Sequence, residues 1–390
     1  MKPFSTKVLH DGQCYSIEGM VDPRFREVAN VFAANFAAGE EVGAAVAVTL
    51  EGRLVVDLWG GYADAARRRL WQRDTIVNMM SVAKGVSALC IHMLADRGQL
   101  STDVPVATYW PEFAAAGKET LPLRFVLDHR AGLTYVTEKL PRGAAYIPRA
   151  VADALARQTP LITPGTEPQY HVLTQGFLLG EIVRRVAGKT LGKFLREEIA
   201  APLGLDYAIG LSNPDQQRCA DFILAPENRI LAAIRAPETP EGVFWAQLCA
   251  DEDFNSPAWR SSEIPSANGH GNPRAIARLY GVLACGGTAD GVRLIGKDAL
   301  TKMTTEQHHL PERLVGRYYH QALGVILNSP PHSYMGPNPK SFGHQGAGGA
   351  HGFADPDAKL GFSYAPNAFK PDPITPTRHR LIDATYAALN

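Results

Sequence analysis

The residues best suited to chemistry in this chain are Ser81 and Lys84, which form a Ser-x-x-Lys tetrapeptide. Side chains three positions apart on a helix are neighbours, so the amine of Lys84 can lie beside the Ser81 hydroxyl. An amine in that place can remove the hydroxyl proton and make the serine a nucleophile. The alternative is structural, with a serine that caps a helix and a lysine in solvent. The spacing alone leaves both interpretations open.

The sequence after this tetrapeptide predicts a mostly buried helix. Residues 85–95 follow an apolar helical pattern that stops at Gly98. Ser81 would then lie near the N-terminus of the helix, where free backbone N–H groups and the positive end of the helix dipole favour developing negative charge. This setting favours the chemical interpretation of Ser81.

A second group that could do chemistry is Tyr170, which follows a proline-containing loop at residues 164–169. It precedes a predicted helix at residues 173–183. A tyrosine beside a lysine ammonium can have its phenolate favoured by the positive charge and can serve as a base. The structural alternative is a loop tyrosine with a packed ring and a hydroxyl in water.

A third segment, residues 342–350, is rich in glycine and precedes the last predicted strands. Glycines let a backbone edge come close to a ligand, and a strand N–H aimed at an acyl oxygen contributes to an oxyanion hole. A dinucleotide-binding fingerprint is excluded, because no strand–turn–helix unit with a later acidic residue surrounds these glycines. A purely structural glycine turn remains the alternative.

These segments must be positioned by elements from both ends of the chain. Periodicity predicts a helix at 22–38, strands at 42–50 and 54–59 joined by a turn, further strands at 321–328, 351–354 and 360–365, and a closing helix at 377–389. Residues 100–300 are predicted to be mostly helices and loops. We therefore expect an α/β (α+β) fold with an antiparallel sheet flanked by helices, built from both termini, and an inserted helical domain.

The expected domain boundaries follow from this division. One discontinuous α/β domain comprises residues 1–100 plus 290–390, and a helical domain comprises residues 101–289. Pockets often form where two domains meet, so the active site is expected at their interface.

Composition limits the classes of partner. The chain has 390 residues with 39 Lys plus Arg and 39 Asp plus Glu, so its formal net charge is zero. This balance gives no electrostatic reason to expect nucleic acid or an anionic membrane as a partner. The first residues lack the apolar core of a secretory signal, and no stretch has the apolar length of a membrane span. A cytoplasmic location is expected.

Neither a disulfide framework nor a metal site is expected. The five cysteines, Cys14, Cys90, Cys219, Cys249 and Cys285, are odd in number and have no zinc-binding spacing. A reducing compartment fits this pattern. The histidines, including the pair His308 and His309, show no ligand spacing with nearby acids and are predicted to be mostly surface groups. No metal and no cofactor are expected.

The three segments in this order match one known family. The chain resembles the serine β-lactamase and penicillin-binding-protein superfamily, on its class C-like side, and most of all the family VIII carboxylesterases. Further residues that carry the resemblance are Leu94–Leu100, Tyr109–Phe113, Leu127–Leu133 and the stretch from Pro164 to Leu205. The resemblance covers nearly the whole chain and implies a β-lactamase-like fold. No serine lies in the G-x-S-x-G motif of α/β-hydrolases, which argues against that fold as the source of esterase chemistry.

The resemblance also implies roles for individual residues. Ser81 would be the acylated nucleophile, Lys84 its base partner and Tyr170 the proton shuttle. The backbone N–H groups of Ser81 and Ala347 would form the oxyanion hole. The family's third motif, often Lys-Thr-Gly, would correspond to His344, Gln345 and Gly346. Which of Lys84 and Tyr170 first takes the proton stays open.

Two departures from the family pattern point to the substrate. The second motif ends in Val172, where relatives have a polar side chain that can hydrogen-bond a substrate amide, and valine cannot. His344 replaces a lysine and is at most partly charged near neutral pH. Both changes weaken recognition of anionic, amide-bearing β-lactams. The expected substrate is therefore a small-molecule carboxylic ester.

Other functions remain alternatives. A D-amino-acid peptidase or amidase, a β-lactamase or an acyltransferase would use the same catalytic set. The alternative outside enzymology is a binding or scaffold protein that kept the fold and lost turnover. Residues 205–265 are a candidate lid, and the candidate pocket walls are Trp245, Phe254, Trp259, Tyr318 and Tyr319. The oligomeric state is not determined by the sequence.

Overall fold

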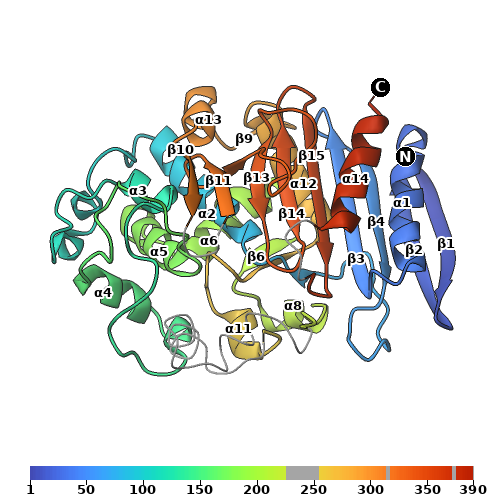
Figure 1. Ribbon diagram of the computed structural model, residues 1–390, viewed down its shortest axis with the longest axis horizontal. Helices are drawn as coiled ribbons and strands as arrows, with labels where there is room; N and C mark the ends of the chain where they lie inside the picture. Colours follow the sequence, from blue (N-terminus) through green and yellow to red (C-terminus); the bar gives the residue numbers. More distant parts are fainter. Residues whose placement is uncertain (225–253, 313–316, 371–374, 390) are drawn as a thin grey trace.

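The computed structural model describes residues 1–224, 254–312, 317–370 and 375–389 (Figure 1). Its centre is a ten-stranded sheet in which all neighbouring strands are antiparallel. From one edge to the other the strands are β1 (Lys2–His10), β2 (Gln13–Val21), β4 (Arg53–Gly61), β3 (Gly43–Leu50), β15 (Leu360–Pro366), β14 (His351–Asp355), β13 (Phe342–Gln345), β12 (Ile326–Leu327), β11 (Arg317–Gln321) and β10 (His308–Glu312).

The two ends of the chain meet in the middle of this sheet. Strand β3 pairs with β15, and Val48 lies opposite Phe362. Residues 43–49 of β3 and all of β15 are buried. Such continuous burial is typical of a strand covered on both faces, which explains why these segments lack polar alternation. The prediction of an antiparallel sheet built from both termini is therefore confirmed.

Helices cover both faces of the sheet. On one face, α1 (Arg26–Ala37), which follows a short 3-10 helix at Pro23–Phe25, packs against α14 (Pro376–Ala387), and both helices share one apolar core with Val46 and Val48 (Figure 1). On the other face lies α12 (Pro273–Ala284), whose Ala277 carbonyl accepts a hydrogen bond from Thr49. Apolar side chains of alternate β3 residues thus enter two separate cores.

The remaining described elements form the mostly helical part of the molecule. Its helices are α2 (Val82–Asp96), α3 (Leu123–Leu127), α4 (Ala150–Arg157), α5 (Thr174–Ala187), α6 (Leu191–Leu195), α7 (Ala201–Leu203), α8 (Asn213–Gln217), α11 (Pro257–Ser261) and α13 (Lys297–Thr304), with a π-helical turn at Arg196–Ala200 and 3-10 turns at Val106–Thr108, Pro111–Ala114 and Ala144–Tyr146. A small sheet joins β5 (Val77–Asn78), β7 (Gly269–Gly271) and β6 (Tyr207–Ile209), and a hairpin joins β8 (Thr288–Ala289) to β9 (Val292–Arg293). Helix α2 packs against α5, α6, α13 and β13.

Two local predictions were wrong or incomplete. The strand predicted at 321–328 is two strands, because Gly324 adopts φ +88° and turns the chain so that Gln321 pairs with Ile326. The β1–β2 hairpin at the N-terminus was not predicted. Only scattered residues of β1 and β2 are buried, such as Phe4 and Tyr15, so its apolar signal is weak.

The division into domains 1–100 plus 290–390 and 101–289 stays a prediction. Helix α12 belongs by sequence to the second segment but packs on β3, β14 and β15, so that segment also contributes to the layer beside the large sheet. Among the described residues, no helix combines the length and the apolar character that crossing a bilayer requires. Cys14, Cys90, Cys219 and Cys285 are free thiols, and Cys249 lies outside the described residues.

Candidate active site

Ser81 occupies the N-cap position of α2. The preceding residue, Met80, has a φ of +47°, a left-handed conformation that is costly for a residue with a side chain. The side chain of Asn78 stabilises this turn by accepting a hydrogen bond from the Met80 N–H at 2.9 Å. A sharp turn therefore places Ser81 at the beginning of α2. This agrees with the prediction that Ser81 lies near the N-terminus of a buried helix.

Lys84 lies one turn further along α2 and is buried, with 1% of its surface exposed. Its Nζ is 3.4 Å from Ser81 Oγ. The same nitrogen donates hydrogen bonds to the carbonyl oxygens of Val172 at 2.6 Å and Ser266 at 3.1 Å. Burial lowers the pKa of Lys84 well below its ordinary value, because the apolar surroundings disfavour the ammonium form.

The surroundings of Lys84 are suited to a neutral amine. A neutral amine has two N–H bonds and one lone pair, and the carbonyls of Val172 and Ser266 accept two hydrogen bonds from it. The lone pair is then left for the third neighbour, the Ser81 hydroxyl. Such an amine can accept the proton of the serine hydroxyl. Ser266 was not singled out in the sequence, and its Ser-Ala-Asn-Gly context carries no signal for this role.

Tyr170 lies beside the amine, although it is far from Lys84 in the sequence. The centroid of its ring is 4.8 Å from Lys84 Nζ, and 8% of its surface is exposed. The ring of Tyr319 stacks on it with a centroid distance of 5.5 Å. Ser81, Lys84 and Tyr170 therefore come together in one site.

The backbone around Tyr170 is held by two side chains and a carbonyl from other segments. The Gln169 N–H donates to the His129 carbonyl at 2.9 Å, the Tyr170 N–H to Glu312 Oε1 at 2.6 Å, and the His171 N–H to His129 Nδ1 at 3.2 Å. The His129 ring also packs on that of Tyr170, with centroids 4.7 Å apart. We call His129 and Glu312 the Tyr170 clamp.

Sequence reasoning missed both residues of the clamp. His129 lies in the Leu127–Leu133 segment that contributed to the family resemblance, but nothing in that segment indicated its partner. It has φ +66° and belongs to a sharp turn. Glu312 is buried, with 2% of its surface exposed, and comes from β10 at the far edge of the sheet.

Strand β13 brings His344 to the site and turns Gln345 away. His344 Nδ1 donates to the Gln345 carbonyl at 2.7 Å, and within the described residues its buried Nε2 has no hydrogen-bond partner. Burial, helped by the charge of Lys84, lowers the pKa of His344 to about 3, so the ring is neutral near pH 7. The Gln345 amide donates to the carbonyl of His332. Alternation along the strand therefore takes the Gln345 side chain away from the site.

The segment after β13 lies against the turn that precedes Ser81. A Cβ atom on Gly346 would come 2.1 Å from the Met79 carbonyl oxygen, so only glycine fits this approach. Ala347 follows directly. In the described part of the chain, neither the Ala347 N–H nor the Ser81 N–H donates a hydrogen bond to another protein group. Both donors remain available to a substrate oxygen.

The prediction that the histidines are mostly surface groups was wrong. Seven of the twelve are buried, namely His92, His129, His171, His270, His308, His344 and His351. His308 donates its Nε2 hydrogen bond to the Asp128 carbonyl, while its neighbour His309 is exposed. Spacing failed here because burial depends on packing of distant segments. Among the described residues, no group of histidines, cysteines and carboxylates could hold a metal ion.

The aromatic residues proposed as pocket walls fall into three groups. Tyr319 contacts Tyr170, as described above, and Tyr318 beside it is exposed. Phe254 and Trp259 are buried and pack edge to face, with centroids 4.7 Å apart. Trp245 and much of the proposed lid at 205–265 lie outside the described residues.

Comparison with known proteins identifies the class that this fold and site define. The Beta-lactamase family model matches residues 28–387. The chain therefore belongs to this family, the superfamily of serine β-lactamases and penicillin-binding proteins, and has a β-lactamase-like fold. The resemblance seen in the sequence is confirmed.

Individual relatives carry more specific names. "Esterase/beta-lactamase LipL" of Mycobacterium tuberculosis is 34% identical over 390 residues, which cover 95% of this chain and 87% of that protein. A family VIII carboxylesterase of known structure is 39% identical with a TM-score of 0.86, covering 95% of this chain and 99% of that one. A penicillin-binding-protein homologue from Caulobacter crescentus is 38% identical with the same TM-score and the same coverage.

Proposed function

We propose that this protein hydrolyses carboxylic esters of small molecules through an acyl-enzyme intermediate on Ser81. The observation that carries the proposal is the environment of Lys84, whose buried amine contacts Ser81 Oγ and donates to two backbone carbonyls. The names of the similar proteins described above, an esterase/beta-lactamase and a family VIII carboxylesterase, support the same reaction class.

In the first half of the proposed reaction, Ser81 Oγ attacks the ester carbonyl carbon while its proton passes to Lys84 Nζ. The negative charge that develops on the carbonyl oxygen is stabilised by the N–H groups of Ser81 and Ala347. The intermediate then collapses, the carbon–oxygen bond to the alcohol breaks, and the alcohol leaves with a proton from Tyr170, which regains one from Lys84 Nζ.

In the second half, water attacks the acyl carbon and its proton passes to the same pair of groups, Lys84 and Tyr170. The bond from the acyl carbon to Ser81 Oγ breaks, the carboxylic acid leaves, and the serine regains its proton. The assignment of Lys84 as the first base rests on its lone pair, because its two N–H bonds are directed at carbonyl oxygens. No cofactor or metal enters this scheme.

The preference for esters over β-lactams rests on two positions. His344 is neutral near pH 7, so it cannot attract a substrate carboxylate as a lysine would. Val172 offers no polar side-chain atom, and its carbonyl already accepts the hydrogen bond from Lys84. β-Lactam hydrolysis is the second candidate, because the name of the Mycobacterium relative includes it. A cytoplasmic location stays a prediction from the sequence.

One substrate panel tests the proposal. The protein is incubated with short- and long-chain p-nitrophenyl esters, a chromogenic cephalosporin and a D-alanine amide, and the panel is repeated with Ser81→Ala and Tyr170→Phe. We expect ester cleavage to be fastest, to be abolished by Ser81→Ala, and to fall at least about a hundredfold in Tyr170→Phe, as for a positioned acid–base group.

The matched control is Tyr280→Phe. The Tyr280 hydroxyl is buried beside α2 and has no hydrogen-bond partner among the described residues, so its loss should leave ester cleavage within about twofold. Unchanged rates in Ser81→Ala would remove this serine from the reaction. Faster turnover of the cephalosporin than of the esters would instead favour the second candidate.

A further inference from the structure

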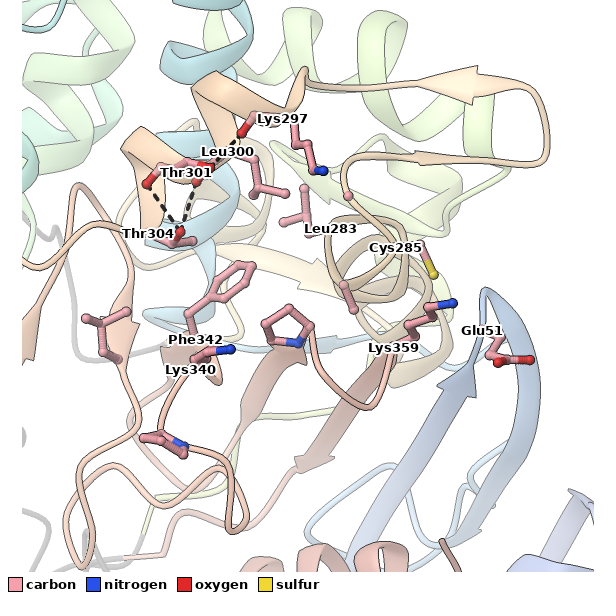
Figure 2. Close-up of a pocket in the computed structure, with 15 residues that line it drawn as sticks. Glu51, Leu283, Cys285, Lys297, Leu300, Thr301, Thr304, Lys340, Phe342 and Lys359 are labelled. Atoms are coloured by element: carbon pink, nitrogen blue, oxygen red, sulfur yellow. Dashed lines mark hydrogen bonds between the residues drawn. The ribbon is translucent and has the colours of Figure 1, made fainter.

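A cavity lies apart from the candidate active site, beside the C-terminal end of α12 (Figure 2). Its volume is about 730 Å³, within the range of small-molecule sites in proteins. It is bounded by the C-terminal end of α12, one face of α13, the β3–β4 turn, and the turn between β14 and β15. We call it the α12–α13 cavity.

The floor of this cavity is apolar. Leu283 and Ala284 come from α12, Leu300 from α13, Leu327 from β12 and Phe342 from β13. These side chains are largely buried, and each exposes 9% of its surface or less. Such a floor can take up a hydrocarbon chain, since removing apolar surface from water is favourable.

The rim of the cavity is cationic. Lys297, Lys340 and Lys359 line it, and Figure 2 shows their ammonium groups spaced around the apolar floor. In the described residues, neither Lys297 nor Lys359 forms an ion pair, while Lys340 pairs with Asp357 at 3.2 Å. Glu51 is the single carboxylate among the lining residues. Three lysines against one carboxylate give the lining a net positive charge beside an apolar surface.

This cavity is distinct from the site around Ser81. None of the residues placed in the candidate active site lines it. It adjoins the opposite end of α2, where Asp96 accepts a hydrogen bond from the Gly296 N–H at the beginning of α13. Helix α2 has 15 residues, so its two ends are about 22 Å apart.

We propose that the α12–α13 cavity binds a medium-chain aliphatic carboxylate. The hydrocarbon chain would lie on Leu283, Leu300 and Phe342, and the carboxylate would meet Lys297 and Lys359 at the rim. The positive charge of the rim and the apolar character of the floor together favour an aliphatic carboxylate over other ligands. An inorganic anion would leave the apolar floor unused, and an alkylammonium ion would be repelled by the rim. The inference does not depend on ester hydrolysis at Ser81.

Octanoate is the probe, used with the unmodified full chain below its micelle concentration. Methyl NMR of Leu283, Leu300 and Leu327 reports directly on the cavity, whatever happens at Ser81. We expect saturable shifts of these methyl signals with a Kd below about 1 mM, and no comparable shifts with octylammonium. The affinity should fall as salt is added, because the lysines are exposed to solvent.

Two variants and a control test the assignment to charge and shape. The double variant Lys297→Gln with Lys359→Gln keeps much of the side-chain length and should weaken octanoate binding at least about tenfold. Thr301→Trp should weaken it by filling the cavity from α13. The control is Lys302→Ala on the same helix, because Lys302 pairs with Asp103 and does not line the cavity.

The proposal is overturned by any of four results. One is the absence of saturable shifts at the three leucines. Another is equal binding of octylammonium. The third is an affinity for octanoate that stays within about twofold of the unmodified protein in the double lysine variant, since a charge-directed site must respond to loss of both ammonium groups. An effect of Lys302→Ala as large as that of the double variant would show only a general response to surface charge and would also overturn it.

Discussion

Hydrogen bonds to the backbone of Tyr170 and of its two neighbours hold Tyr170 in place. Three consecutive backbone N–H groups, from residues 169 to 171, donate to acceptors on His129 and Glu312. Backbone groups in loops are usually free to move with their segment, so fixing all three confines the tyrosine ring. A displacement of about 1 Å at a reacting group can cost on the order of a hundredfold in rate. The clamp is therefore expected to matter for turnover without touching substrate.

We predict that His129→Ala lowers kcat for ester cleavage about tenfold or more with a smaller change in KM, because the His171 N–H loses its acceptor and the Tyr170 ring loses a packing partner. His129→Asn should restore part of the rate. Asparagine offers an acceptor close to the position of Nδ1 and tolerates the left-handed backbone at this residue. Steady-state kinetics on both variants provide the measurement.

A double-mutant cycle separates positioning of Tyr170 from general damage. In the Tyr170→Phe background, His129→Ala should have little further effect on kcat, because the Tyr170 hydroxyl that His129 positions is already absent. If His129→Ala lowered the rate equally in both backgrounds, the clamp would be a stabilising feature only.

At the scale of elements, the site depends on the approach of the β13–β14 connection to the N-terminal end of α2. Gly346 makes this approach, with room for a hydrogen atom but not for a methyl group beside the Met79 carbonyl. The segment that carries the Ala347 N–H is thereby packed against the turn that carries Ser81. A side chain at residue 346 must move one of the two elements.

We predict that Gly346→Ala lowers kcat for esters at least about tenfold, since the Ala347 donor would move away from the developing oxyanion. The matched glycine is Gly180 in α5, where a Cβ would meet only Pro265 at 3.7 Å, an ordinary contact. Gly180→Ala should keep full activity and raise stability by up to about 1 kcal/mol, because alanine favours helix. Thermal unfolding and ester kinetics on both variants check the pair. Full activity in Gly346→Ala would contradict the proposed role of this approach.

For the whole molecule, the seven buried histidines couple stability to pH. Burial lowers the pKa of His92 and His171 to about 4 and of His270 and His344 to about 3, and lowers the pKa of His129, His308 and His351 as well. In the unfolded chain these groups titrate near pH 6.5. Between about pH 6.5 and 4 the unfolded state therefore binds more protons than the folded state, so stability falls as pH falls.

We predict a steep loss of stability on acidification from pH 6.5, on the order of 1 kcal/mol per pH unit for each such histidine. His92 isolates one of these contributions, since its Nε2 donates to the Leu323 carbonyl far from the candidate site. His92→Gln can keep that hydrogen bond but cannot titrate, so it should reduce the slope of unfolding free energy between pH 5 and 6. Urea unfolding at several pH values is the measurement, and an unchanged slope would be the contrary result.

Much of the architecture follows from local sequence patterns. The Ser81–Lys84 spacing fixes two groups on one face of a helix, and the runs at 42–50 and 360–365 indicate buried strands. These properties depend on neighbours within a few positions, and helix and strand periodicities encode them. Gly324 is also a local signal, because a glycine inside a predicted strand indicates a turn or a bulge. The break in the strand expected at 321–328 could therefore have been recognised from the sequence.

Only the tertiary structure decided the chemical state and the surroundings of these groups. The lowered pKa of Lys84, the neutrality of His344 and the contact of Glu312 with the Tyr170 backbone all arise where segments distant in the chain exclude water together. A sequence lists which groups are present and which side of a helix or strand each takes. Desolvation and long-range hydrogen bonds depend on what packs opposite, and no local pattern records that.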